Sequence, residues 1–243
     1  MIPKVIHYCW FGRNPLPDSA KKCIASWGKF LPDYEIKEWN ENNFDVNKIP
    51  YIKEAYKAKK YAFVSDYARF LVLYNYGGLY FDTDVEIIRS IDDIIEKGAF
   101  MGCEGDSTTT EFPIAVAPGL GLGSEPFMPF YKEMIDLYET LHFENTDGTY
   151  NTKTVVSYTT DKLLEYGLKE TPEIQECAGM MIYPKNYFNP KSQVDGKIKI
   201  TENTRSIHHF AGTWMTRGEK LRVYIRSLLG ERFLKLIRPL YKK

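Results

Sequence analysis

Two aspartates, Asp82 and Asp84, stand two positions apart directly after the short apolar run at residues 79–81. Side chains two residues apart at the end of a strand point to the same side, so both carboxylates can face one point. Carboxylate oxygens bind hard divalent cations, and two carboxylates leave coordination positions open for the diphosphate of a nucleotide. Asp-x-Asp pairs are also common in solvated turns, so the pair alone is weak evidence for a metal site.

A second charged pair, Asp66 and Arg69, lies three positions apart in a segment with helical periodicity. Residues spaced i and i+3 share one face of a helix, so both side chains can point into a common cavity. There the carboxylate would accept hydrogen bonds from sugar hydroxyls, and the guanidinium would donate to hydroxyls or to phosphate. Without further context, a plain ion pair within the helix is the more common outcome.

Other polar positions are weaker candidates. The adjacent His208 and His209 could bind a metal, although a lone histidine is more often a core or surface residue. Glu104 and Asp106 follow an apolar run and could face a reacting carbon, although a solvated loop carboxylate is the commoner outcome. No residue stands out as a covalent nucleophile.

The segments that carry these residues alternate between strand and helix patterns. We expect strands at residues 4–10, 34–39, 79–81 and 197–201, helices at 18–27 (with Asp18 as N-cap), 57–76, 129–141 and 155–166, and a glycine-rich segment at 118–124. Gly77 and Gly78 are expected to end the second helix, because glycine accepts the left-handed cap conformation. This alternation predicts an α/β fold, Rossmann-like, with a mostly parallel sheet flanked by helices.

Aromatic and amide side chains join the aspartates at one edge of this predicted sheet. Ligands of α/β sheets bind beyond the carboxyl ends of the strands, which is where Trp10, Trp39 and Asn40 fall. We therefore expect these three residues to line a nucleotide site together with Asp82 and Asp84.

Length and charge limit the classes of protein that are compatible with the sequence. The 243 residues indicate one catalytic domain at residues 1–216 and a basic amphipathic helix at 217–243, which has nine basic and two acidic residues. A formal net charge of zero argues against a nucleic-acid binder. Without a signal peptide or a membrane-spanning run, we expect a cytoplasmic protein. The basic segment would either contact the anionic inner face of a bacterial membrane or pack on the domain.

Motifs in the same order as in one known family span residues 1 to 216. They are Ile2-Pro-Lys-Val-Ile-His-Tyr-Cys-Trp-Phe-Gly12, Ser65-Asp-Tyr-Ala-Arg69, Gly77-Gly-Leu-Tyr-Phe-Asp-Thr-Asp84 and His208-His-Phe-Ala-Gly-Thr-Trp214. Together they resemble glycosyltransferase family 32, the DXD-containing sugar transferases, which include bacterial capsule and lipopolysaccharide transferases. This resemblance implies a GT-A fold, a nucleotide-sugar donor, a divalent metal (commonly Mn²⁺, otherwise Mg²⁺) and retention of anomeric configuration.

The resemblance also implies roles for individual residues. Trp10 matches the ring that stacks on the nucleotide base, Ser65 and Tyr80 match positions along the nucleotide and phosphates, and Asp66 and Arg69 match the pair that binds the donor sugar. The motif that begins at His208 would close the site, with Thr213 where the family usually has serine, Trp214 beside it, and His209 narrowly preferred over His208 as a metal ligand. At Thr159-Thr-Asp161 the chain departs from the Thr-Gly-Pro of many relatives.

The leading hypothesis is a metal-dependent, retaining glycosyltransferase acting in surface polysaccharide synthesis, with a glycan or lipid-linked saccharide as acceptor. A UDP-sugar is the first expectation for the donor, and GDP-mannose is the alternative. We expect front-face displacement, in which the donor phosphate accepts the proton of the acceptor. A sugar nucleotidyltransferase is one alternative, but it would show a glycine-rich basic loop after the first strand. A non-catalytic carbohydrate or calcium-binding module is another, in which Asp82 and Asp84 hold a structural ion.

Overall fold

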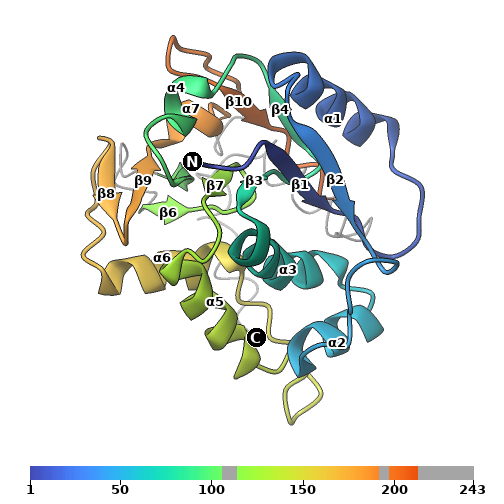
Figure 1. Cartoon of the computed structure of the whole chain (residues 1–243). Coiled ribbons are helices and arrows are strands. Elements are labelled where there is room, and N and C mark those ends of the chain that lie inside the picture. The colour runs from blue at the N-terminus through green and yellow to red at the C-terminus, as the bar shows by residue number, and fades with distance from the viewer. Residues whose placement is uncertain (106–113, 192–196, 213–243) are drawn as a thin grey trace, which may run out of the picture.

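The computed structural model of the chain describes residues 1–105, 114–191 and 197–212. An eight-stranded sheet forms its centre, with the order β2-β1-β3-β7-β5-β9-β8 and with β6 paired to β5 (Figure 1). The pairs β1–β2, β1–β3 and β5–β9 are parallel, while β7 runs antiparallel between β3 and β5. These strands are β1 (Val5–Cys9), β2 (Glu35–Trp39), β3 (Gly78–Tyr80), β5 (Phe100–Gly105), β6 (Ala115–Val116), β7 (Leu122–Ser124), β8 (Gln175–Cys177) and β9 (Met180–Tyr183).

A separate two-stranded ribbon of β4 (Val85–Ile87) and β10 (Ser206–His208) lies beside this sheet. Helices cover both faces of the sheet (Figure 1). On the ribbon side lie α1 (Asp18–Phe30), α4 (Asp92–Ile95) and α7 (Lys185–Phe188), and on the opposite side lie α2 (Pro50–Lys57), α3 (Tyr61–Tyr76), α5 (Pro129–Glu139) and α6 (Val155–Glu165). The predicted α/β class, a sheet flanked by helices, is confirmed.

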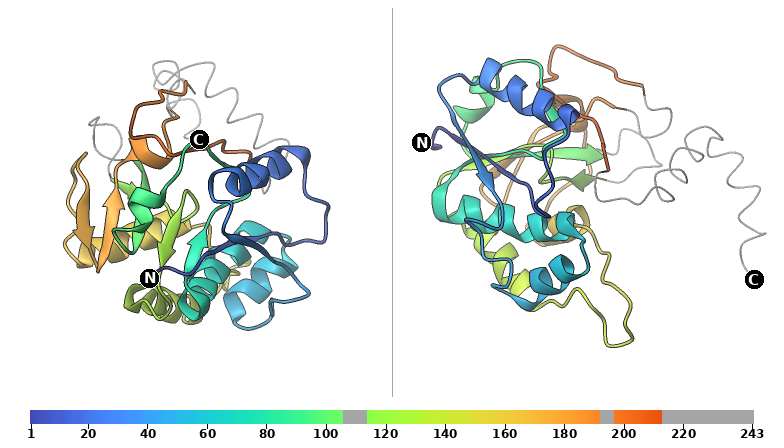
Figure 2. Two further views of the ribbon diagram at one scale, coloured as in Figure 1. Left: turned by 45° about the horizontal axis from the view of Figure 1, so that its top comes forward. Right: turned by 90° about the vertical axis from the view of Figure 1, so that its right-hand side faces the viewer.

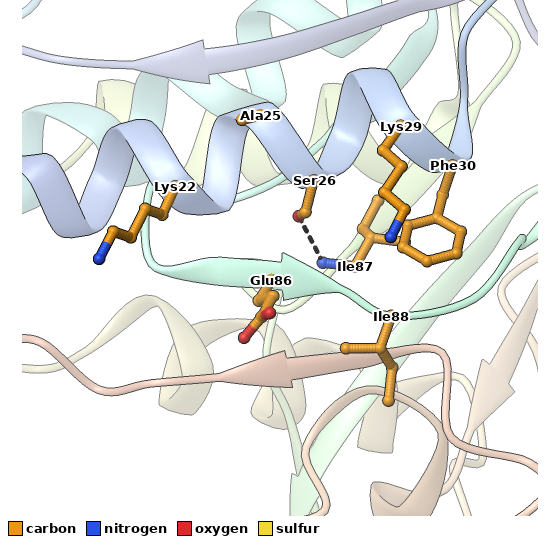
Figure 3. Close-up of a pocket in the computed structure, with 8 residues that line it drawn as sticks. All are labelled: Lys22, Ala25, Ser26, Lys29, Phe30, Glu86, Ile87 and Ile88. Atoms are coloured by element: carbon orange, nitrogen blue, oxygen red, sulfur yellow. Dashed lines mark hydrogen bonds between the residues drawn. The ribbon is translucent and has the colours of Figure 1, made fainter.

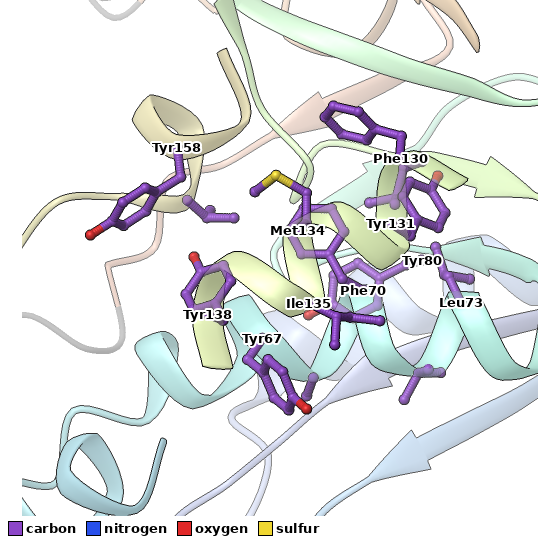
Figure 4. Close-up of a cluster of buried hydrophobic side chains, with 14 of the residues drawn as sticks. Tyr67, Phe70, Leu73, Tyr80, Phe130, Tyr131, Met134, Ile135, Tyr138 and Tyr158 are labelled. Atoms are coloured by element: carbon purple, nitrogen blue, oxygen red, sulfur yellow. The ribbon is translucent and has the colours of Figure 1, made fainter. Parts of the chain in front are cut away.

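The core consists of two clusters of buried apolar side chains. The larger cluster packs α3 and α5 together through residues such as Phe70, Tyr131 and Met134 (Figure 4). The smaller cluster joins α1 to the sheet, with the fully buried Trp27 as its largest side chain. Burial of such side chains stabilises the fold by roughly 1.5–3 kcal/mol each, so the sheet is a rigid base for the loops at its edge.

The helix expected at residues 57–76 is α3, which begins four residues later, at Tyr61; only Lys57 of the expected range belongs to α2, and a break separates the two helices. Proline at the first position starts α2 at Pro50, and the chain breaks where Lys59 has a left-handed φ of 58°. The second helix, α3, ends at Gly77 as predicted, with a φ of 62° and its N–H bonded to Leu73 O at 2.8 Å. Spacing alone missed the break because apolar residues occur on both sides of it.

Three smaller expectations need correction. The residue before α1 is Pro17, and Asp18 is the first helical residue rather than the N-cap. No strand forms at residues 197–201, because the N–H of Lys199 bonds to Pro190 O and only Ile198 forms an isolated bridge. The glycine-rich segment contributes β7, whose Gly123 lies so close to Phe100 and Leu79 that a Cβ would not fit.

Among the described residues, none of the helices has the length and apolar character needed to cross a bilayer. The predicted basic helix at residues 217–243 lies outside the described part of the chain.

Candidate active site

The two aspartates lie in the turn between β3 and β4 rather than on a continuing strand. The N–H of Asp82 donates to Gly119 O at 2.9 Å, and Asp82 O accepts from the N–H of Val85 at 3.0 Å. The carboxylates therefore have separate partners: Asp82 contacts groups from α3 and β3, while Asp84 contacts the end of β10. The two carboxylates were expected to point to the same side at the end of a strand, and in the turn they do not.

A buried charge network connects Asp82 to α3. Arg69 Nη2 lies 2.9 Å from Asp66 Oδ1 and 3.3 Å from Asp82 Oδ1, and the Arg69 side chain is only 4% exposed. Arg69 Nε also donates to Ser65 O at 3.2 Å, and the Tyr80 hydroxyl donates to Asp82 Oδ1 at 3.1 Å. The ion pair within the helix therefore extends to Asp82 of the DXD motif.

Burial controls the charge states in this network. It raises the pKa of Asp66 to about 7, because loss of solvent outweighs the attraction of an Arg69 cation that is shared with Asp82. Burial would lower the pKa of Arg69, but the charge of Asp82 and the other acidic groups more than offsets this, so the guanidinium stays charged. Burial also raises the pKa of Tyr80 well above its usual value, which keeps its hydroxyl a hydrogen-bond donor.

The second half of the site is a contact between Asp84 and His208. The antiparallel register of β4 and β10 places His208 opposite Val85, so its Nε2 lies 3.0 Å from Asp84 Oδ1. The N–H of Ala211 donates to Asp84 Oδ2 at 2.8 Å. Burial alone would raise the pKa of Asp84, but these bonds hold it below its usual value. Burial lowers the pKa of His208, yet the bond to Asp84 reverses the shift and raises it.

The neighbouring His209 points to a different partner. Its Nε2 lies 2.8 Å from Glu86 Oε2, and both side chains are about 40% exposed. His208, rather than the preferred His209, is therefore the histidine that faces the DXD motif.

The donor groups fit a cation that is shared with a phosphate better than one held by protein alone. Within the described residues, no three His, Cys, Asp or Glu side chains gather around one point. Mg²⁺ is commonly held by one or two carboxylates together with substrate phosphates, and Asp84 with the adjoining His208 matches that mode. Asp82 Oδ2 occupies space that a side chain at position 119 would fill, since a Cβ on Gly119 would lie 1.9 Å from it.

Trp10, Trp39 and Asn40, which were expected to line a nucleotide site together, have different surroundings in the structure. Trp39 is 6% exposed and its indole N–H donates to His7 Nδ1 at 3.0 Å, which makes it a core residue and does not support the predicted binding role. The Trp10 side chain is partly buried, and its indole N–H donates to Asn14 O at 2.6 Å. Asn40 uses its side chain to hold its own turn, donating to Glu38 at 2.6 Å.

Other predicted residues are only partly placed. The Ser65 hydroxyl donates to Tyr61 O within α3, and its predicted role at the nucleotide stays a prediction. Glu104 lies on β5 with a pKa raised by burial, against the opposing charges of His208 and Lys185. Thr213, Trp214 and Asp106 lie outside the described residues.

Sequence reasoning missed one contributor to the site, Gly119, and one residue that supports the sheet, Thr160. Gly119 gives Asp82 both a backbone bond and the space for its carboxylate, and its signal was the glycine-rich run at residues 118–124. Thr160, in the segment that departs from the family pattern, accepts the N–H of Val116 at 2.9 Å with its hydroxyl. It therefore anchors β6 rather than facing solvent.

A shallow depression lies between α1 and β4 (Figure 3). Lys22, Lys29 and Glu86 lie around it, and the Ser26 hydroxyl accepts the N–H of Ile87 across its floor at 2.9 Å. Among the residues that line the depression, only Glu86, the partner of His209, connects it to the site. The depression is not lined by Asp66, Arg69, Asp82 or Asp84.

Residues 17–101 match the family described as the glycosyltransferase sugar-binding region containing DXD motif. Inositol phosphoceramide mannosyltransferase 3 of Schizosaccharomyces pombe is 32% identical over 108 residues, which cover 41% of this chain and 29% of that protein. The uncharacterized glycosyltransferase L373 of Acanthamoeba polyphaga mimivirus is 26% identical over 204 residues, 79% of this chain and 77% of that protein. This chain thus spans less than a third of the length of the first relative and about three quarters of the second.

Two solved structures are also similar in outline. The PaToxG glycosyltransferase superposes with a TM-score of 0.49 and 20% identity, covering 68% of this chain and 69% of that chain. The galactosyltransferase LgtC superposes with a TM-score of 0.43 and 12% identity, covering 96% and 94%. The family match includes Asp66, Arg69, Asp82 and Asp84, so the resemblance read from the motifs is confirmed.

Proposed function

We propose that this chain, a glycosyltransferase of the GT-A type with a DXD-containing sugar-binding region, transfers a sugar from a nucleoside-diphosphate donor to a carbohydrate acceptor with retention of configuration. The observation that carries the proposal is the Arg69 cation held between Asp66 and Asp82. The buried Asp66 carboxylate, the Arg69 cation and the partly exposed Asp82 carboxylate form a polar group suited to sugar hydroxyls and phosphate.

Each residue of this site has a distinct task in the proposed reaction. Asp66 would accept hydrogen bonds from hydroxyls of the donor sugar, and Arg69 keeps that carboxylate in place through the 2.9 Å contact. Tyr80 fixes the orientation of Asp82 by donating to Oδ1, which leaves Oδ2 directed at the space beside Gly119.

Asp84 and His208 would hold the divalent cation together with the donor diphosphate. When bound, the cation would offset the negative charge that develops on the departing diphosphate. In this structure the two residues bond to each other, so His208 Nε2 would have to release its proton and its bond to Asp84 before it could bind the cation. Retention of configuration, front-face displacement and Mn²⁺ as the ion rest on the family resemblance.

Donor, acceptor and place of action belong to the proposal as well. A UDP-sugar is the first expectation for the donor, and a glycan or lipid-linked saccharide is expected as acceptor in surface polysaccharide synthesis. The mannosyltransferase named above makes a mannose donor a direct competitor of the UDP-sugar hypothesis. Action on the inner face of a bacterial membrane, with contact through residues 217–243, is the corresponding proposal for location.

A thermal-shift screen of UDP- and GDP-sugars, each with and without Mn²⁺, tests the function. A donor at about 100 times its Kd stabilises the fold by about 2.7 kcal/mol, which corresponds to roughly 5–11 °C for a domain of this size. We expect one donor class to give this shift only when metal is present. Absence of a metal-dependent shift with every nucleotide sugar would contradict the proposal.

A further inference from the structure

An exposed apolar surface lies beside the Asp84–His208 contact. Ile198, Ile200 and Phe210 have 45%, 52% and 40% of their surface exposed, although each is a large apolar side chain. Scattered exposed apolar residues are normal, but apolar groups gathered at one place indicate an interaction site. We name these three residues, with the lysines that border them, the isoleucine surface.

The members of this surface are held together by Lys191. Its backbone forms a bridge with Ile198, and the neighbouring Pro190 O accepts the N–H of Lys199 at 3.1 Å. The Lys191 ammonium lies 5.6 Å from the centre of the Phe210 ring and donates to His209 O at 3.0 Å. The loop that carries the isoleucines projects from the body of the protein (Figure 2). Lys191 thus links the segment of the isoleucines to Phe210, which is separate in the sequence.

The charge around the isoleucine surface is positive. Lysines alternate with isoleucines in the sequence Lys197-Ile-Lys-Ile200, and all four residues are exposed. One acidic side chain of this edge, Asp93, is engaged by Arg205 at 2.9 Å. Basic residues at this edge outnumber acidic ones. The basic residues are Lys191, Lys197, Lys199, Arg89 and Arg205, and the acidic residues are Asp93 and Glu202.

We propose that the isoleucine surface docks on an anionic phospholipid bilayer, with Ile198, Ile200 and Phe210 entering the headgroup region and the lysines meeting lipid phosphates. Apolar side chains ringed by lysines match the chemistry of such an interface. Continuity of the chain supports this partner, because the sequence beyond Gly212 adds nine basic residues and only two acidic ones from position 217 onward.

Docking in this way would bring the candidate active site to the membrane. The ring of Phe210 packs edge-on against His208, with 4.2 Å between the ring centres. A residue that enters the headgroup region would therefore hold the Asp84–His208 contact next to the lipid surface. This placement of the site rests on the proposed function, since a lipid-linked acceptor would be presented at the lipid surface. The docking itself does not depend on glycosyl transfer.

Flotation of the full chain with vesicles of phosphatidylcholine, with and without phosphatidylglycerol, tests the proposal. The informative variant is Ile200→Ser/Lys199→Glu, and the matched control is Leu164→Ser/Lys169→Glu on and after α6, on the opposite side of the sheet (Figure 1). Both remove one exposed aliphatic side chain and reverse one lysine. We expect the first to lower partition onto anionic vesicles by at least about tenfold and the control by less than about twofold.

Other readouts separate docking from unfolding, from the active site and from self-association. Equal melting temperatures for both variants would show that the fold is intact, and equal metal-dependent thermal shifts with donor would show that the donor site is intact. A failure of membrane docking can then be distinguished from a failure of the proposed function. Equal partition of the two variants, or equal wild-type binding to vesicles without phosphatidylglycerol, would overturn the proposal. So would a wild-type dimer in sedimentation that only Ile200→Ser/Lys199→Glu abolishes while vesicle binding persists.

Discussion

Replacement of Arg69 by methionine tests the buried charge network most severely. Arg69 is 4% exposed and neutralises Asp66, which is 10% exposed, and Asp82, which is 31% exposed. Removal of one partner from a buried ion pair typically costs about 3–5 kcal/mol, because the remaining charge is left without compensation. Asp66 can escape part of this cost by binding a proton. We therefore expect Arg69→Met to cost about 3 kcal/mol at pH 8, or roughly 6–12 °C in Tm.

The cost should depend on pH with a definite sign. The folded-state pKa of Asp66 is already raised to about 7 by burial, and loss of Arg69 raises it further. A carboxyl group whose pKa is raised by folding stabilises the fold below its unfolded pKa, and this contribution is lost as the pH rises through the folded value. The destabilisation by Arg69→Met should therefore be smaller at pH 5.5 than at pH 8.

Urea denaturation at the two pH values measures this difference. Lys21→Met is the matched control, because Lys21 and Asp18 form an ion pair at 3.1 Å with side chains that are 60% and 90% exposed. That variant should change stability by no more than about 0.5 kcal/mol at either pH. Equal destabilisation by Arg69→Met at pH 5.5 and pH 8, or a cost no larger than that of the control, would refute the reasoning.

Three further variants test the geometry of the site. His208→Ala should weaken metal-dependent donor turnover by about tenfold or more, while His209→Ala, which removes only an exposed pair, should stay within about threefold. Gly119→Ala should lower turnover by roughly 10² with the fold retained, because its Cβ would lie 1.9 Å from the Asp82 carboxylate and must displace it; unchanged turnover would show that the position of this carboxylate is not critical. Trp39→Phe should cost about 1–3 kcal/mol of stability through the lost bond of the buried indole, with the donor KM unchanged, and a raised KM would restore its binding role.

Local patterns in the sequence located the four longest helices, α1, α3, α5 and α6, and the strands β1, β2 and β3, whereas α2 and most of the other strands were not predicted. A buried apolar run located β1, period-two apolar spacing located β2, and the paired glycines located the end of α3. The antiparallel β7 was not predicted, because glycine carries no periodic side chain and its place between β3 and β5 depends on close contact with Phe100. Local signals identify elements that bury side chains. They do not identify a strand such as β7, in which a glycine is needed because there is no room for a side chain.

The candidate residues could be predicted, but their partners could not. The spacing of Asp66 and Arg69 predicted their pairing, yet the extension to Asp82 depends on how α3 packs against the end of β3. The choice between the two histidines depends on the register of β10 against β4, since a shift of one residue exchanges the side chains on the two faces. Trp39 follows the same logic: its position at a strand end was correct, but its ring points into the core.

Metal-dependent turnover of the donor by Asp84→Asn is the most direct test of the central claim, that the DXD turn holds a cation and the departing diphosphate. The change keeps the size of the side chain and removes the charge next to His208. With Mn²⁺ supplied, we predict a loss of roughly 10² or more in turnover, while Glu86→Gln, in the exposed pair with His209, should stay within about threefold. Near wild-type, metal-dependent turnover by Asp84→Asn would contradict the account.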